Sequence, residues 1–382
     1  MRPKRSVAAR AALTCPYCFG SASLEEVKFR CRGQVAGQRG CADVPDRAFA
    51  TFKRLPAPEL MAPVFAADGR NSLAICPECR LESAHRVCPH CHSRLPGQYV
   101  DTPARIVALI GAKESGKSTY IATLIHELKN RVGKEFGLSL AECDDTTRRR
   151  YREEFFDPLF GARTMVKSTQ STAVGLNHPL LYTITGGRER RRWGRNPAVT
   201  MVLFDNAGED FTSEDAVARN LAYLGAADAV IFLVDPSTLR DEAGLDVIAR
   251  VTEHLRAHHR VKSGALLPVP IALALSKADT LRSDLPRNSR LLEPRPASGI
   301  LDGADRNAVH EEIRALLDIW QARQLDLFIS HNYRRYGLFG LSALGNAPID
   351  QTVDPVGVQP HRVEDPVLWL LHEFGMLPAT KG

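Results

Sequence analysis

The sequence predicts an α/β fold in which a mostly parallel sheet carries helices on both faces, preceded by small cysteine-rich modules. Two observations predict this arrangement. After about residue 100, short apolar runs alternate with helical patterns, as expected for parallel strands joined by helical crossovers. Eight of the nine cysteines precede this alternating region, so a small cysteine-rich part is separated from a larger domain.

The length of the chain, 382 residues with 44% hydrophobic residues, allows two or three folded units. A linker containing Pro and Gly at 95–104 predicts a boundary near residue 100. We therefore expect two small modules in residues 1–98 and one larger domain in residues 99–382. The first 100 residues hold 15 Lys and Arg against 8 Asp and Glu. This excess is too small, once metal-bound thiolates are counted, to predict nucleic-acid binding from charge alone.

Each element of the larger domain has its own pattern. Apolar runs predict strands at 105–111, 180–185, 198–205, 228–235, 269–276 and 336–342. Amphipathic stretches predict helices near 117–130, 213–224, 240–258 and 305–323. The segment near 282–306 is rich in Pro, Arg and Ser and predicts an inserted loop or lid. The tail is rich in Leu and Trp and predicts a last helix near 364–376.

The sequence contains no apolar stretch of the ~18–20 residues that a transmembrane helix needs. Its basic N-terminus lacks the apolar segment of a secretory signal. We therefore expect a cytoplasmic protein without a membrane span. The sequence does not indicate an oligomeric state.

The eight clustered cysteines predict two metal sites with four thiolates each. Two C-x2-C knuckles, Cys76 to Cys79 and Cys88 to Cys91, favour one tetrahedral zinc site. The four others predict a second zinc site: Cys15, Cys18, Cys31 and Cys41. An interleaved pairing between the two sets stays open. Iron in place of zinc also stays open, because thiolates alone do not select the metal.

Four thiolates saturate a zinc ion and leave no open position for catalysis. We therefore expect two structural Zn²⁺ ions that hold together modules too small to bury a large core. Disulfides are disfavoured because a cytoplasm keeps thiols reduced. The nearby His85, His90 and His92 are expected to be solvated rather than ligands.

The stretch GAKESGKST at 111–119 has the spacing of a phosphate-binding loop and joins a predicted strand to a predicted helix. Backbone N–H groups and the helix N-terminus favour phosphate oxygens there. We expect Lys117 to reach the β and γ phosphates and Ser118 to bind Mg²⁺. The loop residues that we assign to nucleotide binding are Gly111, Glu114, Ser115, Gly116, Lys117, Ser118 and Thr119. The loop alone leaves ATPases, kinases and GTPases open.

A D-x-x-G follows the strand predicted at 198–205. In it, Asp205 can hold the Mg²⁺ shell and the Gly208 N–H can sense the γ-phosphate. A switch threonine that meets both Mg²⁺ and the γ-phosphate should lie before the strand at 180–185. Among the three threonines available there, we favour Thr169, then Thr172.

Two later strand ends favour guanine as the base. The element from Ser276 through Lys277 to Asp279 ends on a carboxylate, which can accept hydrogen bonds from the guanine N1–H and exocyclic amine. Adenine offers no such pair of donors. Ser342 and Ala343 follow the next strand, where a backbone N–H can donate to the guanine carbonyl oxygen. The sequence therefore predicts a GTP site.

These elements, in this order, resemble the translation-factor-related and Ras-like (TRAFAC) class of P-loop GTPases over about residues 105–345. The stretches DNAGEDF at 205–211 and RVEDPVLWLL at 362–371 resemble the bacterial double-GTPase families, whose members often carry zinc-ribbon modules. The resemblance implies a Ras-like domain that binds GTP and GDP with Mg²⁺. It also implies a regulatory switch that acts on a protein partner, in systems of biological conflict such as anti-phage defence.

Two positions depart from the pattern of these GTPases. Ser276 stands where Asn or Thr is usual. Its hydroxyl can still form a hydrogen bond to the phosphate loop, but we expect fewer such bonds than the usual residue makes. Glu209 stands where efficient hydrolases carry Gln or His, and its negative charge beside the γ-phosphate should make hydrolysis slow. With Lys117 and Thr169, it is a residue that we expect to act in hydrolysis. The Arg-rich stretch at 186–195 predicts a solvated hairpin tip rather than an arginine finger.

Two other functions stay open at this stage. A GTP sensor with negligible hydrolysis is compatible with Glu209. An RNA- or ribosome-associated zinc-ribbon GTPase is compatible with the basic N-terminus. The aromatic residues of the zinc region, such as Tyr17 and Phe29, suit a small core equally well and do not favour RNA.

Overall fold

The computed structural model describes residues 12–34, 39–112, 114–167, 178–186, 197–204, 222–239 and 243–381. The chain divides into two compact units, with the main break between Ala104 and Arg105. His178 belongs to the first unit although it lies far along the chain. None of the helices within these described residues is long and apolar enough to cross a membrane.

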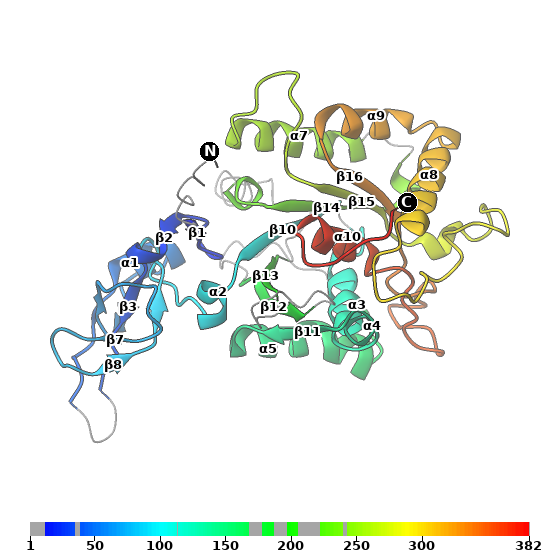
Figure 1. The fold of residues 1–382 in the computed structure, drawn as a ribbon. Helices are drawn as coiled ribbons and strands as arrows, with labels where there is room; N and C mark the ends of the chain where they lie inside the picture. Colours follow the sequence, from blue (N-terminus) through cyan, green and yellow to red (C-terminus); the bar gives the residue numbers. More distant parts are fainter. Residues whose placement is uncertain are drawn as a thin grey trace. The chain divides into compact units, whose positions relative to one another are not determined.

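The first unit is built from short antiparallel ladders, drawn in blue and cyan in Figure 1. Its strands are β1 (Ala12–Thr14) with β2 (Ser21–Ser23), β6 (Val64–Phe65) with β3 (Lys28–Arg30) and β9 (Arg86–Val87), β4 (Val44–Pro45) with β5 (Leu60–Met61), and β7 (Ala74–Ile75) with β8 (Glu82–Ser83). Its helical segments are η1 (Leu24–Glu26), α1 (Arg47–Lys53) and α2 (Gly97–Asp101). Val27, Phe29 and Tyr99 are fully buried and form a small core.

One buried carboxylate organises this unit. Asp46 caps α1 by accepting a hydrogen bond from the Phe49 N–H at 3.0 Å. The same carboxylate accepts from Arg30 at 2.7 Å and lies 2.9 Å from His92 Nδ1. Burial raises the pKa of Asp46, but these hydrogen bonds outweigh burial and hold it below its ordinary value. Asp46 therefore ties the helix to two other segments of the unit.

The second unit contains a seven-stranded mixed sheet (Figure 1). Strand β10 lies at its centre, and its neighbour β14 begins a row of parallel strands; β12 is antiparallel to its neighbours. In spatial order the strands are β11 (Leu138–Glu142), β12 (Leu180–Gly186), β13 (Ala198–Leu203), β10 (Ala104–Gly111), β14 (Ala229–Val234), β15 (Ile271–Leu275) and β16 (Tyr336–Gly340). All residues of β14 and β15 are buried, so both faces of the sheet are covered.

Helical segments connect several of these strands, as the alternating pattern predicted, while most of the helix predicted near 213–224 lies outside the described residues. They are α3 (Lys117–Lys129), α4 (Arg131–Phe136), α5 (Asp145–Arg150), the π-helical η2 (Tyr151–Gly161), η3 (Pro236–Thr238), α7 (Ala243–His258), η4 (Ala278–Leu281), α8 (Gly303–Ile319), α9 (Arg323–Asn332) and α10 (Asp365–Glu373). The predicted fold class, an α/β domain with a mostly parallel sheet behind cysteine-rich modules, is confirmed. The edge strand β11 and helices α4, α5 and α9 were not predicted.

The segment between η4 and α8, predicted as an inserted loop or lid, runs through turns and packs tightly. Leu285, Leu291 and Arg295 of this segment are buried. The Arg295 guanidinium donates to both carboxylate oxygens of Glu135 at 2.8 and 2.7 Å and lies over the Phe136 ring. This part of the segment is therefore fixed against α4.

Candidate functional site

The predicted phosphate loop lies between the end of β10 at Gly111 and the start of α3 at Lys117. The loop therefore lies at the carboxyl end of a central strand, where α/β sheets bind ligands. Two of its residues have left-handed backbone, Glu114 with φ 63° and Gly116 with φ 84°, a conformation that tight turns often require and that glycine adopts most easily. Lys113 lies outside the described residues.

The loop packs closely around its first glycine. A Cβ on Gly111 would lie 2.4 Å from Ser115 Oγ and 2.6 Å from the Leu233 carbonyl oxygen. Ser115 is buried, and its Oγ has no hydrogen-bond partner among the described residues. The Lys117 ammonium donates to the carbonyls of Gly111 at 2.8 Å and Ala112 at 2.9 Å. A narrow loop that offers the unpaired Ser115 hydroxyl and the Lys117 ammonium fits a chain of phosphates.

The two predicted base-recognition elements meet at the same edge of the sheet. Strands β15 and β16 are parallel neighbours with Leu275 opposite Gly340, so the loops that follow them are adjacent. The buried Ser342 hydroxyl donates to Asp279 Oδ1 at 2.5 Å and accepts from the Gly345 N–H at 2.8 Å. One carboxylate oxygen of Asp279 is thereby held in place, and the carboxylate keeps acceptor capacity for a base.

The main chain of Ser342 is already engaged. Its N–H donates to the His361 carbonyl at 2.9 Å, so it is not the N–H that can read a guanine carbonyl. Among the residues that the structure describes, none accepts a hydrogen bond from the N–H of Ala343. Of the two residues predicted for this role, Ala343 is the one that can supply the donor.

The residues preceding Asp279 make contacts that the sequence did not predict. Ser276 Oγ donates to the Val234 carbonyl at 3.3 Å, rather than to the phosphate loop. Lys277 has left-handed backbone, with φ 52°, and its ammonium donates to Asp235 Oδ2 at 2.7 Å. Burial raises the pKa of Asp235, but the hydrogen bonds from Lys277 and Ser237 and the charge of Lys277 together outweigh burial and leave that pKa below its ordinary value. Asp235 follows β14, and only its place at a strand end could have indicated it.

Four predicted residues lie outside the described part of the chain: Thr169, Asp205, Gly208 and Glu209. The alternative threonine at 172 and the Arg-rich stretch beyond Gly186 also lie outside it. The structure therefore shows the phosphate loop and the base-recognition loops at the carboxyl edge of one sheet. The predicted magnesium and hydrolysis residues stay predictions.

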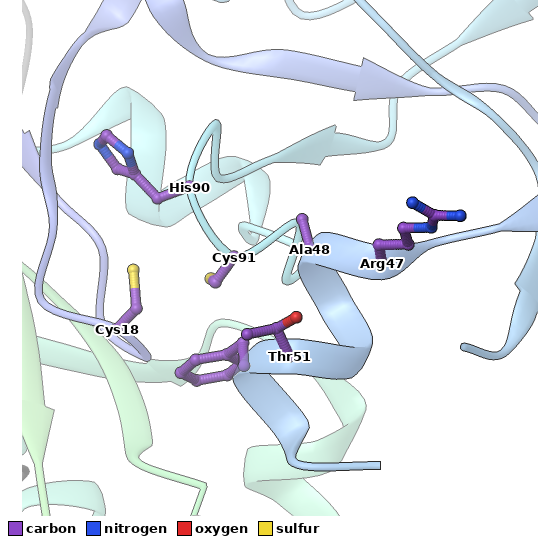
Figure 2. Close-up of a pocket in the computed structure, with 7 residues that line it drawn as sticks. Cys18, Arg47, Ala48, Thr51, His90 and Cys91 are labelled. Carbon is purple, nitrogen blue, oxygen red and sulfur yellow. The ribbon is translucent and has the colours of Figure 1, made fainter. Parts of the chain in front are cut away.

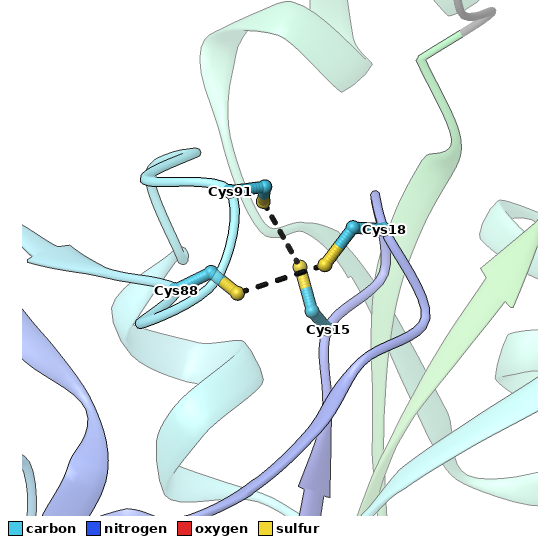
Figure 3. Close-up of side chains that lie close together, drawn as sticks. All are labelled: Cys15, Cys18, Cys88 and Cys91. Atoms are coloured by element: carbon cyan, nitrogen blue, oxygen red, sulfur yellow. Dashed lines mark hydrogen bonds between the residues drawn. The ribbon is translucent and has the colours of Figure 1, made fainter. Parts of the chain in front are cut away.

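The eight cysteines of the first unit form two clusters. In the first cluster, sulfur pairs Cys15–Cys91 and Cys18–Cys88 lie 3.8 and 3.7 Å apart (Figure 3). In the second, sulfur pairs lie 3.5 and 3.6 Å apart, formed by Cys31 with Cys79 and Cys41 with Cys76. Four sulfurs placed 2.3 Å from one zinc in a tetrahedron lie about 3.8 Å apart. Both donor sets therefore fit a four-thiolate zinc ion.

Three of the four cysteine pairs that are close in sequence are C-x2-C knuckles, and all three adopt the same turn. In each knuckle, the carbonyl of the first cysteine accepts a hydrogen bond at 3.0 Å from the N–H of the residue four positions later. These later residues, which all have left-handed backbone, are Phe19, Arg80 and His92. N–H groups also donate to sulfur, from Tyr17 to Cys15 and from His90 to Cys88. These bonds favour thiolates at the turn. The turn is thus shaped for metal ligation.

The pairing differs from the grouping that sequence proximity favoured. Cys15 and Cys18 join the knuckle at 88–91, and Cys31 and Cys41 join the knuckle at 76–79. This is the interleaved alternative. The reason is the antiparallel ladder of β3 and β9, in which Phe29 lies opposite Arg86. Strand β3 leads into Cys31 and β9 into Cys88, so the ladder carries these two cysteines to opposite ends. The expected grouping was therefore wrong.

A hollow of about 470 Å³ lies beside the first cluster. Figure 2 shows Cys18 and Cys91 at this hollow with Arg47, Thr51 and His90. The three histidines predicted to be solvated join neither cluster. His90 Nε2 lies 3.1 Å from the Ser21 carbonyl, and His92 contacts Asp46. Each cluster is complete with four sulfurs, so the hollow adds no fifth ligand to it.

Comparisons with known proteins give a family match and one related protein. A family model described as Double-GTPase 2 matches residues 105–319. A protein of Mycolicibacterium smegmatis named as an ESX-1 scaffolding and assembly protein, SaeC, is 28% identical over 321 residues, which are 77% of this chain and 81% of that protein.

Solved structures of GTPases are also similar at low identity. The Arl6 BBS3 small GTPase of Trypanosoma brucei, bound to a nucleotide analogue, is 16% identical with a TM-score of 0.31, covering 72% of this chain and 99% of that one. The G domain of the T. maritima FeoB iron transporter is 12% identical with a TM-score of 0.26, covering 63% and 88%. The SRb-GTP/SRX complex of Chaetomium thermophilum is 16% identical with a TM-score of 0.30, covering 65% and 95%.

Proposed function

Because the chain belongs to the Double-GTPase 2 family, we propose that it binds GTP with Mg²⁺, hydrolyses it slowly to GDP, and acts as a regulatory switch on a protein partner. The observation that carries this proposal is that both kinds of recognition loop lie at the carboxyl edge of one sheet. The phosphate loop follows β10, and the Asp279–Ser342 pair follows β15 and β16. A nucleotide lying across this edge would meet both.

Phosphate binding rests on the loop that starts at Gly111. The Lys117 ammonium would exchange the carbonyls of Gly111 and Ala112 for the β and γ phosphate oxygens, which are stronger acceptors because they are charged. Backbone N–H groups at the start of α3 would complete the cradle. Thr119 lies in this first turn and is buried.

Base choice rests on Asp279. A carboxylate accepts hydrogen bonds but cannot donate them when ionised, so it selects the N1–H and amine of guanine. The Ser342 hydroxyl orients it, and the Ala343 N–H would donate to the guanine carbonyl oxygen. A base lacking these groups would leave buried polar atoms unsatisfied, at a cost of about 1–3 kcal/mol each.

Magnesium would be held by Ser118 with Asp205 and Thr169, and it would neutralise charge on the phosphates. Glu209 would lie beside the attacking water. Its negative charge beside the γ-phosphate predicts slow intrinsic turnover, which a partner could raise by supplying a cation. Slow turnover suits a switch, because the GTP-bound form then persists long enough to act.

The two cysteine clusters would hold structural zinc. Their donor sets and sulfur spacing support this assignment. A unit whose strands have two or three residues buries little apolar surface, so metal binding would supply much of its folding free energy.

The partner is expected to be another protein. The similarity to a protein named for scaffolding and assembly supports a role in assembling other proteins more directly than a role in anti-phage defence. The latter rests only on the resemblance of DNAGEDF and RVEDPVLWLL to the wider double-GTPase families. Proteins that co-purify with the GTP-loaded chain, compared with the GDP-loaded chain, would identify the partner.

Two measurements on the purified full-length chain test the proposal. Chromatography of the nucleotide released on denaturation should show GDP or GTP; recovery of ATP alone would overturn the assignment of the base. Phosphate release with GTP and Mg²⁺ should be slow but detectable. If bound GTP stays intact, the chain is a GTP sensor, the alternative that Glu209 keeps open.

A further inference from the structure

The base-recognition loop after β16 is held by a distant segment of the chain. Ser342 and His361 exchange two main-chain hydrogen bonds, from Ser342 N to His361 O at 2.9 Å and from His361 N to Ser342 O at 2.8 Å. The Gln359 N–H donates to the Leu344 carbonyl at 2.8 Å. Residues 359–361 therefore run antiparallel to residues 342–344 and fix their register.

The approach of the two segments is close. Gly345 has φ +84°, and a Cβ at this position would lie 2.2 Å from the Gln359 carbonyl oxygen. A side chain there would push the segments apart. The loop therefore depends on residue 359 lying where it does.

His361 anchors this segment on its outer side. Its Nε2 lies 2.7 Å from the Leu291 carbonyl. A carbonyl only accepts, so Nε2 must carry the hydrogen and donate. Leu291 belongs to the segment predicted as an insertion, and its side chain packs where a Cβ on Gly340 would lie. The insertion thus contacts both β16 and residues 359–361.

Arg362 clamps the segment in place. It is buried, with φ 53°, a left-handed conformation that costs free energy in a residue other than glycine. Its five N–H donors are all used. Nε donates to the Glu293 carbonyl. One terminal nitrogen donates to the carboxylates of Asp305 and Asp365. The other donates to Asp305 and to the Arg290 carbonyl, and all five donor–acceptor distances lie between 2.8 and 3.2 Å.

Arg362 therefore joins three parts of the second unit. Arg290 and Glu293 lie in the predicted insertion, Asp305 lies in α8, and Asp365 begins α10. A residue that forms five bonds across these parts compensates for its strained backbone. That backbone in turn sets the position of His361, its neighbour in the chain.

We infer that residues 359–362, clamped by Arg362, position the loop that reads the guanine carbonyl. Pairing with His361 uses the Ser342 N–H and leaves the Ala343 N–H as donor for the base. Arg362 is a positioning residue, since it acts through His361 and Ser342. This inference rests on the proposed GTP binding and adds to it a second source of base specificity, separate from the carboxylate of Asp279.

The Ser342 hydroxyl links the two sources of specificity through its bond to Asp279, but the two have separate backbone supports. The Asp279 backbone is held in η4, next to an Ala278 N–H that donates to the Leu341 carbonyl at 2.9 Å. The Ser276 N–H donates to the Val234 carbonyl at 2.9 Å. None of these bonds involves residues 359–362. Weakening the clamp should therefore affect recognition of the guanine carbonyl more than recognition of its amine.

The test compares three nucleotides on the full-length chain and on Arg362→Lys. Lysine keeps the charge but has only three N–H groups and no fork, so it cannot span the acceptors of Arg362. 6-Thio-GTP keeps the N1–H and amine of guanine but replaces the carbonyl oxygen by sulfur, a poor acceptor. ITP keeps the carbonyl and lacks the amine. Dissociation constants for GTP and both analogues are measured by titration calorimetry.

We expect the unaltered chain to prefer GTP over 6-thio-GTP by about 2- to 12-fold, the equivalent of one neutral hydrogen bond. In Arg362→Lys this ratio should fall toward one, while the preference for GTP over ITP persists. An unchanged 6-thio-GTP ratio in the variant would overturn the inference. If the unaltered chain fails to bind GTP at all, the proposed function itself is wrong.

A ratio of dissociation constants does not depend on the fraction of protein that is folded, so partial unfolding of Arg362→Lys does not hide the answer. Asp305→Asn, which weakens the same clamp from α8, should lower the same ratio. Arg335→Lys is the matched control, because Arg335 precedes β16 at its opposite end and pairs with Glu373 at 2.9 Å. Faster amide hydrogen exchange at Ser342 should accompany loss of the ratio in Arg362→Lys and not in the control.

Discussion

Asp279 accepts a 2.5 Å hydrogen bond from the Ser342 hydroxyl, which links the loops that follow two neighbouring parallel strands. The bond occupies one carboxylate oxygen and orients the other. Ser342 is itself held by the Gly345 N–H, which donates to the same hydroxyl oxygen. The base-reading group is thus fixed before any nucleotide binds, which lowers the entropy cost of binding.

Asp279→Asn should change which base is preferred. The amide oxygen can still accept from the Ser342 hydroxyl, which directs the amide NH₂ toward the base. An NH₂ donates, so it repels the guanine amine and pairs with the carbonyl that xanthine carries at the same position. We expect GTP affinity to fall by at least ~10-fold and XTP affinity to rise above it. Competition between the two nucleotides for the purified variant measures this.

Asp284→Asn provides a control with the same change of charge. Asp284 is exposed, and its carboxylate accepts a hydrogen bond from the neighbouring Ser283 hydroxyl at 3.3 Å. Its substitution should leave the preference for GTP intact. A preference for GTP that survives Asp279→Asn would mean that the base is recognised elsewhere.

Much of this site follows from short sequence motifs, because each motif places its residues on one strand end. Gly111 through Ser118 and the Asp279 element were predicted in this way. The contacts of Asp235 with Lys277 and the clamp around Arg362 were not, since they join residues far apart in the chain. The cysteine grouping failed for the same reason: it depends on an antiparallel ladder of two-residue and three-residue strands, too short to show a periodic pattern.

Lys117→Ala should abolish GTP binding at micromolar concentrations. The ammonium would contribute two charge-assisted hydrogen bonds to phosphate, each worth about 1.5–3 kcal/mol, so affinity should fall by ~10²-fold or more. Titration with a fluorescent GTP analogue measures the loss. Lys262→Ala removes an equal charge from an exposed position and should bind normally. Equal binding by both variants would refute the phosphate-loop assignment.

Gly111→Ala should weaken nucleotide binding without unfolding the domain. The added Cβ would lie 2.4 Å from Ser115 Oγ and 2.6 Å from the Leu233 carbonyl oxygen, so the loop must shift and its N–H groups lose their alignment. Two misaligned hydrogen bonds to phosphate predict a loss of ~10-fold or more. Gly161→Ala is the matched control, because a Cβ there meets nothing within 4 Å. If Gly111→Ala binds nucleotide as tightly as this control, the loop can accommodate a Cβ at residue 111 and the prediction is wrong.

The cysteine pairing makes a prediction that separates the two groupings. Metal analysis of the purified chain should give about two zinc ions. Cys15→Ser with Cys88→Ser removes two ligands of one cluster and should leave one zinc. Cys76→Ser with Cys88→Ser removes one ligand from each cluster and should leave none that survives dialysis against a chelator.

The grouping by sequence proximity predicts the reverse, with both zinc ions lost from the first double variant and one retained by the second. Cys143→Ser is the control, since Cys143 belongs to neither cluster and contacts Thr183 at 3.2 Å. It should retain both ions. Inductively coupled plasma mass spectrometry measures the number of zinc ions per chain. The two groupings predict values that differ by one ion in each double variant, and in opposite directions, so partial occupancy cannot make one grouping look like the other. Iron in place of zinc would leave the pairing argument intact and change only the metal, because the geometry selects which sulfurs meet and not which ion they hold.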